Sequence, residues 1–194
     1  EIRDEILFKQ PESSHLGHCP IFYLPLSLDI EKSVLQTCCS KVICNGCAYA
    51  NQKRELEKRL QPACPFCRNI LPKTDEEAEI NYMRRVAAND PVAVREIGMK
   101  HFNNGDYERA FEYLTKAAEL GDASAHYLLS LLYHDGLGVE KDEKKELYYL
   151  EEAAIAGLPE ARYYLAVNEG GNERYDRSAK HLIIAANLGH DGSI

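Results

Sequence analysis

The sequence predicts a two-part fold, in which a small cysteine-rich α+β module precedes an all-α solenoid of helix-turn-helix repeats. Two observations predict it. All seven cysteines of the 194-residue chain fall before residue 68. A short motif of two alanines and a glycine then recurs three times in the second half, where most of the alanine and tyrosine lies. This change of composition in mid-chain indicates two domains rather than one.

Residues 1–17 show no clear periodicity, and the run Gln10-Pro11-Glu12-Ser13-Ser14 is typical of a mobile segment. We therefore expect a flexible lead-in with no function of its own. The chain begins with glutamate rather than methionine, and it stops where a further helix would start. We expect a fragment of a longer protein, for which the lack of a targeting signal says little about the compartment.

Two pairs of cysteines have the spacing of zinc ligands. Cys44 and Cys47 are followed, after sixteen residues, by Cys64 and Cys67. Each Cys-x-x-Cys turn brings two thiolates to one side, where a tetrahedral Zn²⁺ can bind both. Ordinary buried thiols and disulfides are the alternatives. The odd number of cysteines and the absence of a secretory signal argue against disulfides, so we predict zinc and a reducing compartment, the cytoplasm or nucleus.

The remaining cysteines complete a family resemblance. Cys19 is followed by Pro20-Ile21, and the adjacent Cys38 and Cys39 precede the first Cys-x-x-Cys pair. Over residues 18–72 this order resembles the RING finger family, in which the first and third ligand pairs hold one zinc and the second and fourth hold the other. The resemblance implies two zinc sites with the ligands Cys19, Cys38, Cys39, Cys44, Cys47, Cys64 and Cys67.

The first zinc site departs from the RING pattern. Phe22 stands three residues after Cys19, where the family has its second ligand, and a phenyl ring cannot bind zinc. The expected first site is therefore incomplete. His18, His15 or a water molecule could supply the fourth ligand, although His18 is adjacent to Cys19 and would have to reverse the usual side-chain direction.

The second zinc site departs from the commonest RING pattern in another way. Lys41 occupies the position of a histidine ligand, and a protonated lysine has no lone pair to offer. The spacing from Cys39 to Cys44 fits the all-cysteine variety of the family, with Cys38 as the partner of Cys39. The chain must turn sharply there, because adjacent ligands point apart in an extended strand.

Within the module, we expect short strands at residues 34–36 and 41–43 and a helix over about residues 47–60, which Pro62 ends. A helical connector is predicted over residues 73–89, since Thr74 and Glu77 form a capping box at its start.

A repeating pattern occupies residues 90–194. The glycines that close the three alanine motifs, Gly121, Gly157 and Gly189, are 36 and 32 residues apart, a period typical of helical solenoids. Aspartate or proline opens each expected helix, and glycine ends the second helix of each unit in the left-handed conformation. We expect about three units, the last truncated.

These units resemble the Sel-1-like repeat family, a relative of the tetratricopeptide repeats. The stretch from Tyr133 to Gly157, with its loop Asp135-Gly136-Leu137-Gly138-Val139, is a near-complete unit, whereas the first and third units lack this loop. The resemblance implies an α-solenoid whose concave face binds another protein.

Charge and composition restrict the function further. The net charge is −8 and no basic face is evident, so nucleic-acid binding is not supported. The longest apolar run, residues 21–28, is too short and proline-rich to span a bilayer. The scattered histidines have no cysteine or carboxylate at a fixed spacing beside them, so we assign no catalytic nucleophile.

Two functions remain open. As a RING-type ubiquitin ligase, the module would bind a ubiquitin-conjugating enzyme and hold its ubiquitin thioester in a reactive orientation, while the repeats recruit the substrate. The resemblance assigns Ile21 and Pro65 to the conjugating-enzyme dock and Arg68 to the linchpin that bridges both proteins; alternatively, Arg68 is an exposed charge or a local carbonyl contact. As a non-catalytic scaffold, the module would be only a zinc-stabilised fold, and Phe22 favours this function because an incomplete site loosens the dock.

Overall fold

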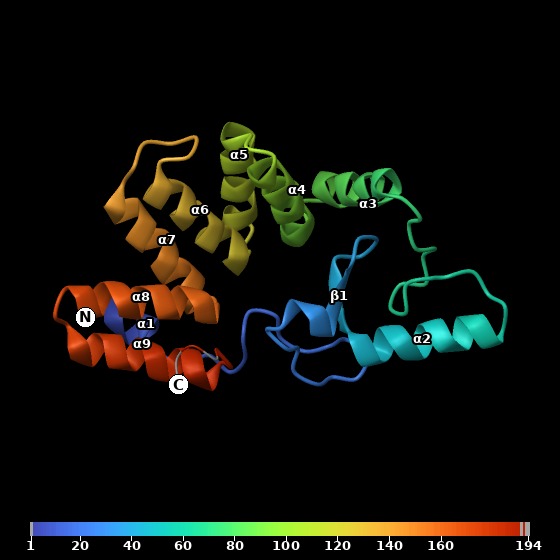
Figure 1. Cartoon of the computed structure of the whole chain (residues 1–194), viewed down its shortest axis with the longest axis horizontal. Helices are drawn as coiled ribbons and strands as arrows, with labels where there is room; N and C mark the ends of the chain where they lie inside the picture. Colours follow the sequence, from blue (N-terminus) through green and yellow to red (C-terminus); the bar gives the residue numbers. More distant parts are fainter. Residues whose placement is uncertain (1, 191, 193–194) are drawn as a thin grey trace. The chain divides into compact units, whose positions relative to one another are not determined.

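The computed structural model describes residues 2–190 and 192, which divide into two compact units (Figure 1). Residues 16–93 form the cysteine unit. The repeat unit comprises residues 94 onward together with the N-terminal segment up to His15. Among the described residues, no helix combines the length and the apolar character needed to cross a membrane.

The cysteine unit contains a two-stranded antiparallel sheet followed by helices. Strands β1 and β2 pair in the register Ser33↔Cys44 to Gln36↔Lys41, close to the predicted ranges. The first helix after the sheet starts two residues earlier than predicted and ends at Glu57 instead of residue 60. The elements are the 3-10 helix η1 Ile30–Lys32, β1 Ser33–Gln36, β2 Lys41–Cys44, α2 Asn45–Glu57 and α3 Asp75–Ala87.

The predicted cap of α3 is present, but its apolar side is not buried. The Thr74 hydroxyl accepts a hydrogen bond from the Glu77 backbone N–H at 3.3 Å, and the Glu77 carboxylate accepts one from the Lys73 N–H at 2.7 Å. Ile80 and Met83 remain about half exposed. Local capping therefore starts this helix without help from a packed face.

The repeat unit is built from antiparallel helix pairs, each helix thirteen residues long. Aspartates cap four of them as the sequence predicts: Asp90, Asp106, Asp122 and Asp142 accept backbone N–H bonds in the first turns of the helices that follow. The helices are α4 Pro91–Asn103, α5 Tyr107–Glu119, α6 Ala123–Asp135, α7 Glu143–Ile155, α8 Pro159–Gly171 and α9 Tyr175–Asn187.

The N-terminal segment differs from the expectation of a flexible lead-in. Ile2–Leu7 form helix α1, which packs on the repeat unit, and the Leu7 side chain is only 1% exposed. Leu7 belongs to an apolar cluster with Leu150, Leu158 and Leu165 of the second and third repeats. No local pattern predicts this order, because the stabilising contacts come from residues of the second and third repeats, far along the chain.

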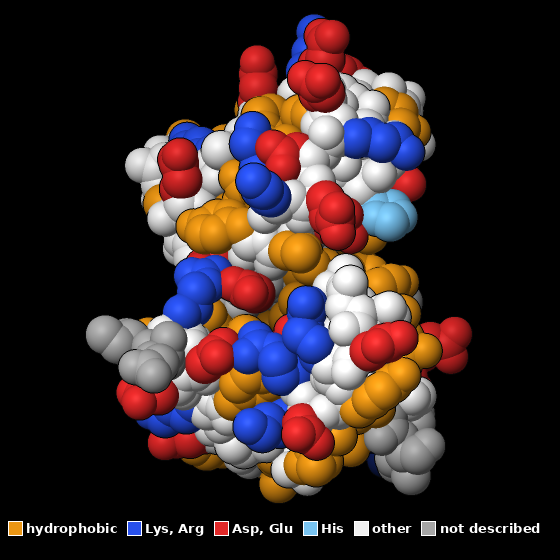
Figure 2. Space-filling view, turned by 90° about the vertical axis from the view of Figure 1, so that its left-hand side faces the viewer, with side chains coloured by type: hydrophobic (Ala, Val, Ile, Leu, Met, Phe, Trp, Pro, Cys, Tyr) orange, Lys and Arg blue, Asp and Glu red, His pale blue; other side chains and the backbone are white. Residues whose placement is uncertain are grey.

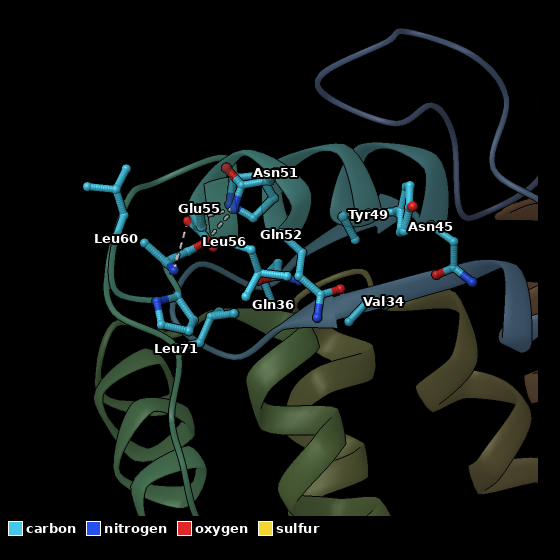
Figure 3. Close-up of a pocket in the computed structure, with 14 residues that line it drawn as sticks. Val34, Gln36, Asn45, Tyr49, Asn51, Gln52, Glu55, Leu56, Leu60 and Leu71 are labelled. Carbon is cyan, nitrogen blue, oxygen red and sulfur yellow. Dashed lines mark hydrogen bonds between the residues drawn. The ribbon is translucent and has the colours of Figure 1, made fainter. Parts of the chain in front are cut away.

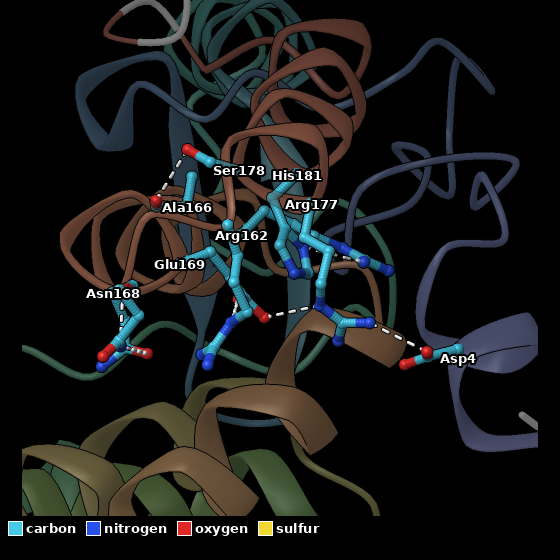
Figure 4. A network of polar contacts seen from close by, with 10 residues as sticks. Asp4, Arg162, Ala166, Asn168, Glu169, Arg177, Ser178 and His181 are labelled. Carbon is cyan, nitrogen blue, oxygen red and sulfur yellow. Dashed lines mark hydrogen bonds and ion pairs between the residues drawn. The ribbon is translucent and has the colours of Figure 1, made fainter.

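Buried polar side chains lie beneath this segment, on α8 and α9 (Figure 4). Arg162 and His181 are fully buried, and the Arg162 Nη1 lies 3.4 Å from the His181 Nδ1. Burial, followed by the nearby guanidinium of Arg162, lowers the pKa of His181 to about 4. The imidazole is therefore neutral in the folded chain at neutral pH.

The loop between α6 and α7 contains two glycines in the left-handed conformation, Gly136 and Gly138. A Cβ at Gly138 would lie 2.7 Å from the backbone carbonyl carbon of Tyr107, at the start of α5. The glycine is required here both by its φ of +69° and by the close approach of the first repeat to the loop of the second.

We predict that Gly138→Ala destabilises the repeat unit more than Gly105→Ala does. Both glycines have positive φ, but a Cβ at Gly105 meets no atom within 4 Å. Left-handed strain alone costs roughly 1–2 kcal/mol, and the collision with Tyr107 adds to it. Urea unfolding of the two variants measures the difference. Equal losses of stability would contradict a close packing of this loop on α5.

We also predict a loss of stability on acidification that depends on His181. The unfolded chain takes up a proton near pH 6.5, whereas the folded chain does so only near pH 4. Because the unfolded state binds more protons between these values, the free energy of unfolding falls as pH drops through that range. The urea midpoint should fall less steeply with pH in His181→Asn than in the parent chain or in His134→Gln, whose ring is exposed.

Candidate metal centre

Four thiols converge between the β-hairpin and the last Cys-x-x-Cys turn. The sulfur atoms of Cys38, Cys39, Cys64 and Cys67 all lie within 4.8 Å of one another. The Sγ–Sγ distance is 3.3 Å between Cys38 and Cys67 and 3.9 Å between Cys39 and Cys64. All four are free thiols, and such a cluster has the donor set of a structural tetrahedral zinc site.

A second cluster contains three thiols, those of Cys19, Cys44 and Cys47. Cys44 ends β2 and Cys47 lies in the first turn of α2, while Cys19 comes from the segment before the sheet. The Cys19 and Cys47 sulfurs are 3.6 Å apart, and both residues are buried. Among the described residues, no fourth Cys, His, Asp or Glu joins this group.

The two clusters interleave along the chain. Cys19 groups with the later pair Cys44 and Cys47. The pair between them in the sequence groups with the last pair, so that the other cluster is Cys38, Cys39, Cys64 and Cys67. This is the grouping implied by the RING resemblance. The adjacent Cys38 and Cys39 reach one site because the chain turns sharply there, with Ser40 in the left-handed conformation. Lys41 has an exposed side chain in β2 and is not part of the cluster.

The turn after Cys64 shows how its backbone presents two sulfurs. The Arg68 N–H donates to the Cys64 carbonyl at 2.9 Å, and the Cys64 N–H donates to the Asn69 carbonyl at 2.7 Å. The Cys67 N–H also donates to the Cys64 sulfur at 3.5 Å. Arg68 closes the turn with a φ of +66°.

The turn after Cys19 has the same backbone pattern but lacks the second sulfur. The Tyr23 N–H donates to the Cys19 carbonyl at 2.8 Å, the Cys19 N–H donates to the Leu24 carbonyl at 2.9 Å, and Tyr23 has a φ of +59°. Phe22 therefore occupies the position that corresponds to Cys67. Phe22 is 64% exposed, so the turn keeps its backbone shape although phenylalanine stands where the other turn has a cysteine.

Burial and hydrogen bonds shift the pKa values of the thiols in the three-thiol cluster in opposite directions. Burial raises the pKa of Cys19, but hydrogen bonds from the backbone of Phe22, Cys44 and Ile21 outweigh it and lower the pKa to about 7. In the same cluster, burial and the neighbouring thiols raise the pKa of Cys47 to about 12. These thiols cannot all ionise side by side without a positive charge among them.

Neither histidine considered as a fourth ligand joins the three-thiol cluster. The His18 ring is exposed and stacks on Tyr23, with ring centroids 5.3 Å apart. His15 belongs to the repeat unit, where its backbone N–H donates to the Gly157 carbonyl at 2.9 Å.

A groove of about 580 Å³ runs along α2 in the cysteine unit (Figure 3). Pro65, one residue of the predicted dock, lines it together with α2 residues such as Tyr49 and Leu56. Ile21, the other predicted dock residue, is 44% exposed but is not among the lining residues. The complete lining is Val34, Gln36, Asn45, Ala48, Tyr49, Asn51, Gln52, Glu55, Leu56, Leu60, Pro62, Ala63, Pro65 and Leu71.

The side chain of Arg68, the predicted linchpin, is exposed and tied to α2. Its Nη1 donates to the Asn51 Oδ1 at 3.3 Å. The amide nitrogen of Asn51 donates in turn to the Ala63 carbonyl at 3.0 Å and to the buried carboxylate of Glu55 at 2.8 Å. Sequence reasoning missed Asn51 and Glu55, because polar residues on a helix rich in charge gave no signal of burial.

Comparison with known proteins identifies the repeats. The family model for the Sel1 repeat matches residues 98–122, 123–158 and 159–190. The crystal structure of a Sel1 repeat protein from Oxalobacter formigenes is 26% identical, with a TM-score of 0.51 over 59% of this chain and 92% of that one. A protective antigen of uropathogenic Escherichia coli with an SLR fold is 21% identical, with a TM-score of 0.56 over 77% of this chain and 31% of that one.

Two curated relatives match parts of the chain. The "Putative RING finger protein ORF96" of Ostreid herpesvirus 1 is 31% identical over 67 residues, which are 34% of this chain and 28% of the relative. The "Putative beta-lactamase HcpC" of Helicobacter pylori is 37% identical over 60 residues, 31% of this chain and 21% of the relative. The chain thus spans less than a third of either relative.

We predict that Phe22→Cys increases the zinc retained by the chain after washing with a mild chelator. A fourth thiolate on the matching turn would complete a tetrahedral site, and metal binding of this kind adds directly to folding stability. The parent chain should retain one tightly held zinc and the variant two, measured by elemental analysis.

Ile21→Cys is the matched control, since it adds a thiol one residue away from the matching position. An equal gain of zinc in both variants would show that the turn does not direct the ligand. No gain in Phe22→Cys would contradict the correspondence between Phe22 and Cys67.

Proposed function

Because residues 98–190 carry three Sel1 repeats, we propose that the repeat unit binds a protein partner while the cysteine unit docks a ubiquitin-conjugating enzyme, in the manner of a RING-type ligase. The repeats support the first part of this proposal, since stacked helical repeats present an extended surface suited to protein ligands. The chain would supply no nucleophile of its own and would act by positioning.

One observation carries the ligase part of the proposal. Along the chain, Cys19 groups with the third ligand pair, and the second pair groups with the fourth. Local Cys-x-x-Cys pairing alone does not require this crossed arrangement. Such crossing would fix both ends of the module with two zinc ions. It would keep Pro65 at a fixed position relative to the surface of α2, as a docking site needs.

Arg68 is suited to a bridging role. Its guanidinium is exposed, and the hydrogen bond from its Nη1 to Asn51 limits the positions that the side chain can take. Arginine offers five donors in a planar fork, so the remaining nitrogens could bind carbonyl groups of a conjugating enzyme and of ubiquitin together.

A non-catalytic scaffold is the second candidate, and Phe22 favours it. With three thiols in the cluster of Cys19, Cys44 and Cys47, zinc would be held less firmly near Ile21, one of the two dock residues. In this case the cysteine unit would serve as a folded spacer, and the activity of the protein would be the binding of partners by its repeats.

We predict that Arg68→Ala slows the discharge of ubiquitin from a charged conjugating enzyme about tenfold, which corresponds to roughly 1.4 kcal/mol of transition-state stabilisation. Arg54→Ala is the control, because Arg54 also donates to the Asn51 Oδ1 at 3.3 Å but lies on α2. It should change the rate little.

Single-turnover discharge of the thioester to free lysine, with the zinc-loaded chain and a panel of conjugating enzymes, provides the measurement. If the parent chain accelerates discharge from none of them, the ligase function is wrong and the scaffold function is the one that remains. Equal slowing by both variants would show that Arg68 acts only by holding Asn51.

A further inference from the structure

The N-terminal segment lies on the repeat unit in the way that a bound peptide would. Helix α1 packs against α7, α8 and α9, from which it is separated by more than 130 residues of chain (Figure 1). Leu7 inserts into the apolar cluster of these repeats. Phe8 packs on the His181 ring at a centroid distance of 4.7 Å, beneath the charged ends of Arg177 and Lys180.

Charged groups on the segment match charges on the repeats. Arg3 pairs with Glu151 at 2.5 Å and with Glu152 at 3.2 Å, while Asp4 pairs with Arg177 at 2.8 Å. On the face that Figure 2 shows, basic and acidic side chains lie among hydrophobic ones. Arg3 and Asp4, which have opposite charges, and the apolar anchors Leu7 and Phe8 make the segment complementary to the repeats.

Arg162 is the unusual feature of this contact. The guanidinium is fully buried, and its Nη1 donates to the backbone carbonyl of Leu7, at the C-terminal end of α1. Its Nε and Nη2 have no hydrogen-bond partner among the described residues. Glu169, on the same helix, pairs with Arg174 and Arg177 instead (Figure 4).

A buried guanidinium is poorly satisfied when one nitrogen reaches only a neutral carbonyl and a neutral imidazole and the other two have no partner. Arginine binds carboxylates through two parallel hydrogen bonds, and unpaired buried donors are costly. A carboxylate at the position of the Leu7 carbonyl would offer a second oxygen to the unpaired nitrogens. The surface is therefore better matched to a ligand with a carboxylate at this point than to the segment that occupies it.

We propose that residues 2–15 are an internal ligand that covers the partner-binding surface of the second and third repeats. The external partner is an amphipathic helical peptide that carries a carboxylate where the segment has the Leu7 carbonyl. This inference rests on the proposed binding role of the repeats and names the partner by its chemistry. Binding of the partner displaces the segment.

The internal ligand sets the apparent affinity. A tethered segment competes at an effective concentration that no dilution lowers, and only the fraction of chains with an open surface can bind a partner. Loosening the segment should therefore tighten the binding of an external peptide without any change to the repeats themselves.

Fluorescence anisotropy with a labelled peptide of residues 2–15 tests this competition. The full chain carrying both Arg3→Glu and Asp4→Lys should bind the peptide at least tenfold more tightly than the parent chain, because the reversed charges weaken only the internal copy. Glu5→Lys, on the same helix, is the control and should bind as the parent does.

Phe8→Ala supplies a second way to loosen the segment, and urea unfolding checks that every variant remains folded. If neither loosened variant binds the peptide more tightly than the parent chain, the segment is a fixed part of the repeat unit and the proposal is wrong.

The carboxylate is tested with a peptide that ends at Leu7. Made as a free acid, this peptide places its terminal carboxylate at the Leu7 carbonyl, whereas the C-terminal amide does not. The loosened chain should bind the acid at least tenfold more tightly than the amide, and this preference should vanish in Arg162→Met. Equal binding of acid and amide would overturn the role of Arg162.

These measurements are independent of the cysteine unit. A chain that fails to discharge ubiquitin but binds the peptide as expected would refute only the ligase function. A chain that discharges ubiquitin but shows no competition would refute only the internal ligand.

Discussion

The core of residues 16–93 is built around seven thiols that converge in two groups. Among the described residues, its core cluster is small: Cys19, Cys47 and Cys64 are buried in it beside Leu26 and Ile43, and a few partly buried apolar side chains such as Leu71 pack against it. So little apolar surface cannot offset the conformational entropy of a segment this long. Metal binding is the interaction that would supply the missing free energy, because zinc coordination and folding are a single process in modules of this size.

The repeat unit is stabilised in another way, by close contact between small side chains. Fully buried alanines such as Ala117, Ala125, Ala153 and Ala161 lie where consecutive helices meet. Their lack of bulk lets helix axes approach closely, and the larger tyrosines fill the spaces between helices, as in the stacked rings of Tyr133 and Tyr149. This packing is local to neighbouring repeats, so each unit supports the next.

These two kinds of interaction explain what sequence reasoning could find. Ligand spacing, helix caps and the glycine period are local signals, and the strands, the capped helices, the thiol groups and the repeats appear close to where they were expected. Helix α1 was missed because its order comes from residues far away in the chain. Arg162 and His181 gave no signal for the same reason, since nothing in their local sequence shows that another segment covers them.

The retained turn at Phe22 has a consequence for how this module can change. The backbone that would direct a ligand is already in place. The turn after Cys19 has the two backbone hydrogen bonds found in the turn after Cys64, and Tyr23 has the left-handed conformation of Arg68. Phenylalanine and cysteine codons differ by a single nucleotide. A complete metal site and an incomplete one are therefore one point mutation apart, and a gene of this kind could pass between the two forms without first remaking the fold.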